Sequence, residues 1–402
     1  MEKKTLSYVT YIAAASFLIL FFNSGARYAF GVALKPMISE FGTGRAGISS
    51  VFLVNMIVFA FFLIVAGKIF DRFGARPVLL VSTILLSLGL YLTSRVHSFL
   101  GLLFSYGIIA ALGISGTSVP IISAIVSKWV SKSEGLIVSL SLSGNSIGQF
   151  VLVPLFGFLS QKYGWRNAYS FFAAIILVVN ILLSILVIKE PNEKNRTFTE
   201  SEKDLLGSYD MELSQSLKTP SMWFFMIMMF ICGGGDYFVV THLVAMATDF
   251  GISQKEATAM LGLYGLMSLL GILIAGPVAD KSGCRLPIGI TFILRVFLFG
   301  MIFLSKSRPS FYLFSFLFGL THLVTAPLTP YLAGKMYGKS HLGAITGLIN
   351  TVHFLGGGLM GYLGGLIFDT TGSYQLSFVV LGMMSGVAFL ATSLIREKRH
   401  HV

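Results

Sequence analysis

Three charged residues lie inside long apolar segments, where water cannot solvate them. Arg27 falls in SFLILFFNSGARYAFGVAL (16–34), Asp236 in CGGGDYFVV (232–240) and Arg295 in TFILRVFLFG (291–300). A charge at the centre of a bilayer costs about 2.5–3.5 kcal/mol on insertion scales, so such a residue usually faces a cavity or a partner. We expect Arg27 to attract an organic anion and Asp236 to be its protonatable partner. The alternative is a permanent ion pair between the two, and Arg295 serves either coupling or structure.

Histidines and neutral polar groups accompany these charges. Because the pKa of histidine is about 6.5, an intramembrane histidine suits proton coupling, although an interhelical hydrogen bond is the alternative. No two histidines share a helix at i, i+4 spacing, so no metal site is predicted. The predicted proton-coupling residues are Asp236, His242, Arg295 and His322. The predicted substrate-binding residues are Arg27, Tyr28, Asn145, Tyr237, Tyr331 and His353; each neutral group could instead join two helices.

The elements that position these residues are predicted to be membrane-spanning helices. The chain has 402 residues, of which 55% are hydrophobic and 11% charged, whereas soluble domains carry about 25% charged residues. Spans of about 20 apolar residues recur along it. They predict an all-α membrane protein of twelve transmembrane helices, at 11–34, 47–69, 77–94, 99–126, 135–160, 167–188, 221–247, 256–279, 286–304, 310–334, 342–368 and 375–395.

Several classes of protein are excluded by the same composition. The continuous apolar runs do not fit the weak 10-residue alternation of a β-barrel. Two cysteines, Cys232 and Cys284, make neither a disulfide scaffold nor a four-ligand metal site. The full phosphate-loop pattern Gly-x-x-x-x-Gly-Lys-Ser/Thr does not occur. We therefore expect no enzyme activity and no cofactor. The net charge of +12 reflects membrane topology and needs no nucleic acid.

The only long polar stretch lies in the middle of the chain. It predicts an N-terminal bundle of six helices at 1–188, a linker at 189–218 and a second bundle at 219–402. Most lysines and arginines fall on the side of the termini and the linker, which places these in the cytoplasm. We expect a multi-pass, monomeric protein of the cytoplasmic (inner) membrane, in contact with lipid, a small carboxylate and protons.

The two halves repeat each other. Shifted by 209 residues, Arg27 meets Asp236 and Tyr28 meets Tyr237, and near the ends of the halves the shift is 208. Parallel repeats indicate two bundles related by an axis along the membrane normal, with the substrate at their interface.

Two loops carry a family resemblance. GKIFDRFGAR (67–76) and GPVADKSGCR (276–285) resemble the loop signature of the major facilitator superfamily, which implies its fold of two pseudo-symmetric six-helix bundles. On this basis Asp71, Arg76, Asp280 and Arg285 are assigned to gating. The alternative is that these charges only set the topology.

A narrower resemblance concerns the first and seventh helices. RYAFGVALKPMISEFGTGRAGIS (27–49) and THLVAMATDFGISQKEA (241–257) are similar to the monocarboxylate porter branch and its oxalate/formate exchanger relatives. The resemblance implies a secondary transporter that works by alternating access, and Arg27 falls where some carboxylate porters carry a lysine. The eighth-helix arginine common in that branch is absent from 257–279. We expect a proton-coupled, lactate-like monocarboxylate symporter; the alternatives are an anion exchanger of the oxalate/formate type or an efflux transporter of a small amphipathic solute.

Overall fold

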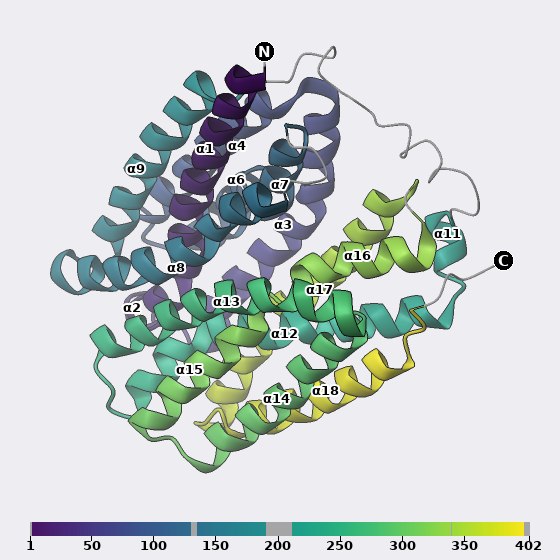
Figure 1. Ribbon diagram of the computed structural model, residues 1–402. Helices are drawn as coiled ribbons and strands as arrows, with labels where there is room; N and C mark the ends of the chain where they lie inside the picture. Colours follow the sequence, from purple (N-terminus) through teal and green to yellow (C-terminus); the bar gives the residue numbers. More distant parts are fainter. Residues whose placement is uncertain (1, 130–134, 190–210, 339, 398–402) are drawn as a thin grey trace.

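The computed structural model describes residues 2–129, 135–189, 211–338 and 340–397, and all regular elements in these ranges are helical. Twelve spans in the described residues are long and apolar enough to cross a membrane. The predicted all-α membrane fold with twelve transmembrane helices is confirmed. Figure 1 shows the helices of the N-terminal half and those of the C-terminal half as two neighbouring bundles.

The N-terminal half contains the first six spans. They are formed by α1 (Glu2–Tyr28) with α2 (Phe30–Phe41), α3 (Arg45–Phe73), α4 (Ala75–Thr93), a fourth span of α5 (Phe99–Leu102), the π-helix η1 (Leu103–Ala110), α6 (Ala111–Gly116) and α7 (Val119–Ser127), then α8 (Gly135–Tyr163) and α9 (Trp165–Leu186). The first span is longer than predicted, because α2 continues through Pro36 as far as Phe41.

The C-terminal half contains the other six spans. After the short α11 (Leu213–Ser216) they are α12 (Pro220–Asp249), α13 (Gln254–Ser282), α14 (Arg285–Leu304), α15 (Arg308–His322) with α16 (Thr325–Tyr337), α17 (Leu342–Thr371) and α18 (Gln375–Leu394). Most of the predicted linker lies outside the described residues. Its last part, 211–218, lies against α16, where the Met211 amide donates to the Tyr337 carbonyl at 2.9 Å.

Two spans are interrupted beside residues that the sequence singles out. The first span changes from α1 to α2 directly after Tyr28, and the tenth breaks after His322. The tenth-span break precedes Pro327, which has no amide hydrogen to continue the helical ladder. Broken helices near the middle of a membrane are typical of transporter binding sites. The breaks therefore place Arg27 and His322 where backbone and side chains can serve a ligand.

We call the membrane face at which α3, α13 and α18 end the terminal face, and the opposite one the far face. The two halves are held together at the far face. Asp249 at the end of α12 accepts from Lys35 at 2.6 Å and from Arg45 at 2.8 Å. Asp369 of α17 accepts from the amides of Arg45 and Ala46 at 2.9 and 2.8 Å. A carboxylate is favourable at a helix N-terminus, so Asp369 caps α3 from the other half.

The remaining contacts of Arg45 complete this arrangement. Its guanidinium donates to the Tyr374 hydroxyl at 2.7 Å and lies 3.4 Å from the centre of the Phe368 ring. We call Lys35, Arg45, Asp249, Asp369 and Tyr374 the far-face lock. Their contacts with one another cross between the halves and hold the halves together at the far face.

Close backbone packing lets the halves meet there. A Cβ atom on Gly365 would come 2.7 Å from the backbone of Arg45, and one on Gly31 would come 2.2 Å from the Val240 carbonyl oxygen. Both distances are shorter than side chains tolerate, so only glycine allows α17 to approach α3 and α2 to approach α12 this closely.

We predict that Asp249→Asn loosens the far face. The neutral amide removes the charge that holds Lys35 and Arg45, so opening costs less free energy. Amide hydrogen exchange in 42–48 and 248–252 should be faster than in the unmodified protein. The control is Glu256→Gln, which removes an ion pair with Arg308 inside one half. Equal exchange in both variants would show that Asp249 does not hold the halves together.

Candidate functional site

Arg27 lies in the last turn of α1, next to the interface between the halves. Its Nη2 donates to the Tyr237 hydroxyl at 2.7 Å. The guanidinium carbon lies 4.5 Å from the ring centre of Phe59 and 5.6 Å from that of Phe354. The charge is thus held by a tyrosine and two aromatic faces from both halves, an arrangement that attracts a cation without neutralising it.

The guanidinium of Arg27 has N–H groups that are still able to donate to a ligand. Within the described residues no acidic side chain forms an ion pair with it, and its Nε has no hydrogen-bond partner. The side chain is partly exposed. A guanidinium offers five donors in a planar fork, which matches a carboxylate in a bidentate manner. In the part of the chain that the structure describes, Arg27 is therefore a cation without a counter-ion at the meeting of the two bundles.

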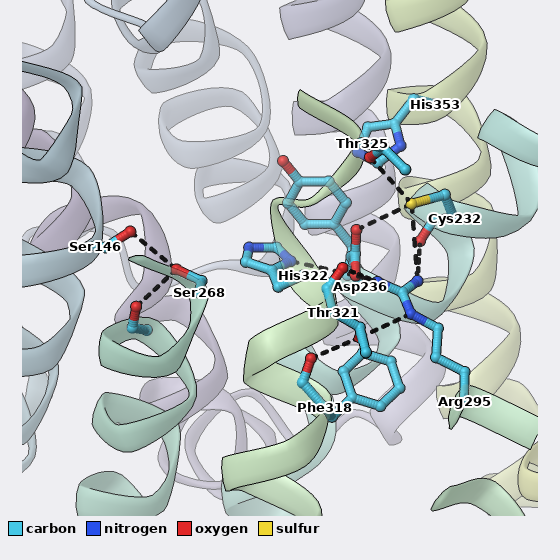
Figure 2. A network of polar contacts seen from close by, with 12 residues as sticks. Ser146, Cys232, Asp236, Ser268, Arg295, Phe318, Thr321, His322, Thr325 and His353 are labelled. Carbon is cyan, nitrogen blue, oxygen red and sulfur yellow. Dashed lines mark hydrogen bonds and ion pairs between the residues drawn. The ribbon is translucent and has the colours of Figure 1, made fainter. Parts of the chain in front are cut away.

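Asp236 and Arg295 form a buried ion pair within the C-terminal half. Asp236 Oδ1 and Arg295 Nη2 are 2.6 Å apart, and both side chains are 1% exposed. Figure 2 shows Arg295 reaching Asp236 and the broken tenth span. There it donates to the hydroxyl of Thr321 at 3.0 Å and to its carbonyl at 3.1 Å, and it also donates to the Cys232 carbonyl at 3.2 Å. Each of the three guanidinium nitrogens of Arg295 donates to a group of the protein, so none is left to bind a substrate.

The expected pairing of Arg27 with Asp236 is wrong. The two are repeat mates, yet Asp236 faces Arg295 within its own half, and the neighbouring residue, Tyr237, contacts Arg27. The reason is the helix period: consecutive residues point about 100° apart around α12. The repeat places the two residues at matching positions along the chain but does not turn their side chains toward each other.

His322 is the histidine that contacts Asp236. Its Nδ1 lies 3.2 Å from Asp236 Oδ1, and the side chain is 3% exposed. Neither ring nitrogen has a hydrogen-bond partner among the described residues, so the 3.2 Å contact with Asp236 is an ion-pair distance and not a hydrogen bond. The imidazole lies 4.6 Å from the Tyr264 ring and 6.5 Å from the Tyr28 ring, measured between ring centres. His322 therefore links Asp236 to the residue that follows Arg27.

His242 and His353 occupy different surroundings. His242 Nε2 lies 2.7 Å from the Gly361 carbonyl and its Nδ1 lies 2.9 Å from the Tyr374 hydroxyl. Both nitrogens are engaged beside the far-face lock, because six residues turn His242 about 120° away from Asp236. Although both are predicted proton-coupling residues, His242 and Asp236 lie on different faces of α12. His353 is partly buried on α17, with Nδ1 3.2 Å from the Met229 carbonyl.

The other predicted ligand-binding residues are spread more widely. Tyr237 binds Arg27 directly, and Tyr28 is buried against His322. Asn145 is buried on α8. Tyr331 is 53% exposed on α16, and within the described residues no hydrogen bond joins it to Arg27 or Asp236. The structure gathers Arg27, Tyr28 and Tyr237, and leaves Tyr331 apart.

The predicted gating residues lie at the terminal face. Arg76 donates to the carbonyls of Ile185 and Ile188 at the end of the sixth span, at 2.8 and 3.2 Å. Its repeat mate Arg285 donates to the Ser393 carbonyl at the end of the twelfth span. Asp71 and Asp280 are exposed. The arginines thus fasten two helices within each half, and their gating role remains a prediction.

The fold also brings together three potential metal ligands whose spacing in the sequence does not predict a metal site. Cys232, Asp236 and His353 have potential ligand atoms within 4.8 Å of one another. The Arg295 guanidinium binds Asp236 and also lies 3.7 Å from the Cys232 sulfur, and this positive charge opposes a metal cation. We interpret the cluster as part of the polar network around the ion pair.

The far-face lock and the contacts of Thr321 with Arg295 have no signal in the sequence. Arg45 and Asp249 lie at helix ends, where charged residues are common. Nothing in one sequence shows that these ends, more than 200 residues apart, meet in space.

We predict that Arg295→Gln strongly destabilises the protein, because it leaves the Asp236 carboxylate buried without its cation. Breaking a buried pair costs about 3–5 kcal/mol, so the thermal unfolding temperature in detergent should fall. Adding Asp236→Asn should recover much of the loss, since no charge then remains. A single variant as stable as the unmodified protein would contradict this role of the pair.

Comparison with known proteins agrees with this architecture. The family model of the Major Facilitator Superfamily matches residues 16–245 and 225–402. Monocarboxylate transporter 13 of Bos taurus is 25% identical over 385 residues, covering 93% of this chain and 88% of the relative. Monocarboxylate transporter 11 of Mus musculus is 26% identical over 280 residues, covering 69% of this chain and 60% of the relative.

Solved structures show the same fold at lower identity. A D-xylose-proton symporter superposes with a TM-score of 0.75 at 16% identity, over 98% of this chain and 100% of that one. A nucleoside transporter gives 0.76 at 14% identity, over 96% and 98%. With twelve spans in two repeated bundles and a family match over nearly its whole length, the chain belongs to the Major Facilitator Superfamily, as a membrane transporter that resembles the monocarboxylate branch and not as an enzyme.

Proposed function

We propose that the protein is a proton-coupled symporter of a small monocarboxylate. The observation that carries this proposal is Arg27, an intramembrane guanidinium that has no acidic partner within the described residues. A cation left uncompensated there is costly, and a substrate carboxylate would offset that cost. The names of the relatives, monocarboxylate transporters, support the same substrate class.

The surroundings of Arg27 favour one carboxylate over two. Of the two intramembrane arginines, Arg295 is fully engaged by Asp236, Thr321 and Cys232. Arg27 is bordered by Phe59, Phe354 and the Met56 sulfur, which lies 3.9 Å from Nη2. A second carboxylate would meet this apolar wall without a counter-charge. The eighth span, which lacks an arginine, contributes Tyr264 beside His322 instead.

Asp236 and His322 are the proposed proton-binding pair. The carboxylate and the imidazole are 3.2 Å apart and buried, so they can share one added proton. Tyr237 connects Asp236 to Arg27 along α12, while the Tyr28 ring connects Arg27 to His322. Protonation would weaken the hold of Asp236 on the nearby positive charges, and a bound anion would compensate for the added charge. Proton and carboxylate would therefore bind together.

Alternating access follows from the arrangement of contacts. The halves are held at the far face by the lock around Arg45 and Asp249. We propose that the terminal face is cytoplasmic, that both termini lie there, and that this conformation is closed toward the outside of the inner membrane. Opening outward requires the lock to break. Asp71 and Asp280, exposed at the terminal face, are proposed to join the gate that then closes the cytoplasmic side of a monomeric carrier.

Replacing Arg27 tests the substrate site. Arg27→Ala should abolish binding and uptake of labelled lactate in proteoliposomes while the protein stays folded, because no acidic partner is left unpaired. Arg27→Lys should weaken binding without abolishing it, since the charge remains but the bidentate fork is lost.

Arg308→Ala is the matched control, because Arg308 is an exposed arginine at the far face, in an ion pair with Glu256. It should bind lactate normally. If Arg27→Ala still accumulated lactate at the unmodified rate, the anion-binding role would be refuted; a loss of stability like that of Arg295→Gln would refute the view that Arg27 lacks a counter-ion.

Replacing His322 tests the coupling. His322→Gln keeps a polar side chain but cannot take up a proton, so uptake should lose most of its acceleration by an acidic exterior. His97→Gln, at an exposed position, should keep it. Uptake by the unmodified protein that is indifferent to the pH gradient would instead favour anion exchange.

A further inference from the structure

The outer surface of the C-terminal half is hollowed at a place away from Arg27. A cavity of about 950 Å³ opens between α14 and α18 at the terminal face. Figure 1 shows these two helices side by side at the outer edge of the bundle. The lining of this cavity includes Arg285, Leu286, Ile290, Ile293, Arg396 and Glu397. The cavity therefore faces the lipid and not the interface between the halves.

The lining is divided into a charged end and an apolar wall. Arg285 and Arg396 lie where α14 begins and α18 has ended. From there one face of α14, with Leu286, Ile290 and Ile293, runs about 12 Å into the membrane at 1.5 Å per residue. Leu286 and Ile290 are 50% and 53% exposed. Such a cavity suits a molecule with a polar head and an apolar tail.

The charged end has spare positive charge. The Arg396 amide donates to the Ser221 hydroxyl, and its exposed guanidinium forms no hydrogen bond or ion pair within the described residues. The one acid, Glu397, is already held: it accepts from the Arg285 amide and lies 3.4 Å from Lys335 Nζ. Arg396 is therefore free to bind an anionic group at the level of the lipid headgroups.

A similar cavity lies at the corresponding positions of the N-terminal half. A smaller one, of about 310 Å³, is lined by Phe73, Arg76, Pro77, Ile188 and Lys189. At the repeat offsets of 209 and 208 residues these positions correspond to Ser282, Arg285, Leu286, Arg396 and Glu397. In both halves an arginine donates to at least one backbone carbonyl at the end of the neighbouring span. The cavity is thus a feature of the fold, enlarged in the C-terminal half.

We propose that the cavity between α14 and α18 binds an anionic phospholipid, with the phosphate at Arg396 and one acyl chain along Leu286, Ile290 and Ile293. Basic pockets between transmembrane helices at one membrane face are suited to acidic headgroups, and an arginine binds phosphate through paired N–H groups. Hydrocarbon must fill a groove on the lipid-facing surface, and the free guanidinium selects a negative head.

Native mass spectrometry of the full chain in mild detergent tests the proposal, with phosphatidylglycerol and phosphatidylcholine of identical acyl chains added separately. The unmodified protein should retain phosphatidylglycerol in preference to phosphatidylcholine. Arg396→Gln should lose this preference at one site. Arg72→Gln should keep it, because Arg72 is exposed at the same face but lines neither cavity.

A second pair of variants tests the acyl wall. A Cβ atom on Gly289 would lie 3.5 Å from the Phe389 ring, an ordinary contact, so Gly289→Leu fills the cavity; Gly300→Leu places the same side chain in open space on the same helix. Gly289→Leu should reduce retention and Gly300→Leu should not. Equal retention of both lipids by the unmodified protein, unchanged retention in Arg396→Gln, or displacement of the lipid by inorganic phosphate alone would overturn the proposal.

Discussion

The ion pair between Asp236 and Arg295 determines how the C-terminal half is organised. Neither charge can be solvated by the bilayer, so each needs a complete set of partners inside the protein. Arg295 obtains them by reaching from α14 to the Cys232 carbonyl of α12 and to the broken end of α15, where it donates to the Thr321 carbonyl. The pair therefore holds three helices together and stabilises the break beside His322.

The two intramembrane arginines are stabilised in different ways. Arg295 is surrounded by acceptors and belongs to the framework, whereas Arg27 rests on aromatic faces and one tyrosine hydroxyl. Aromatic faces lower the cost of a buried cation but do not cancel its charge. That difference is the physical basis for our proposal that Arg27, and not Arg295, binds the substrate.

The repeat explains why Arg27 and Asp236 occupy corresponding positions in the two halves. The contacts that differ between the halves distinguish the two residues. The dipeptides Arg27–Tyr28 and Asp236–Tyr237 occupy equivalent positions, and each uses its tyrosine to contact the other half. The far-face lock has no such symmetry, because one basic residue of the N-terminal half, Arg45, meets acids from two helices of the other half.

Hydrophobic runs and charge placement by themselves determined the membrane class, the twelve spans and the two repeated halves, because a bilayer imposes a fixed length on each helix and excludes charge. The same cost singled out Arg27, Asp236 and Arg295 as residues that need partners. Only the tertiary structure decided the partners: Asp236 met Arg295 and not Arg27, and His322 rather than His242 joined it. The rotation of each helix about its axis and the positions of the breaks set these contacts. Both depend on packing between segments far apart in the chain, which no local pattern records.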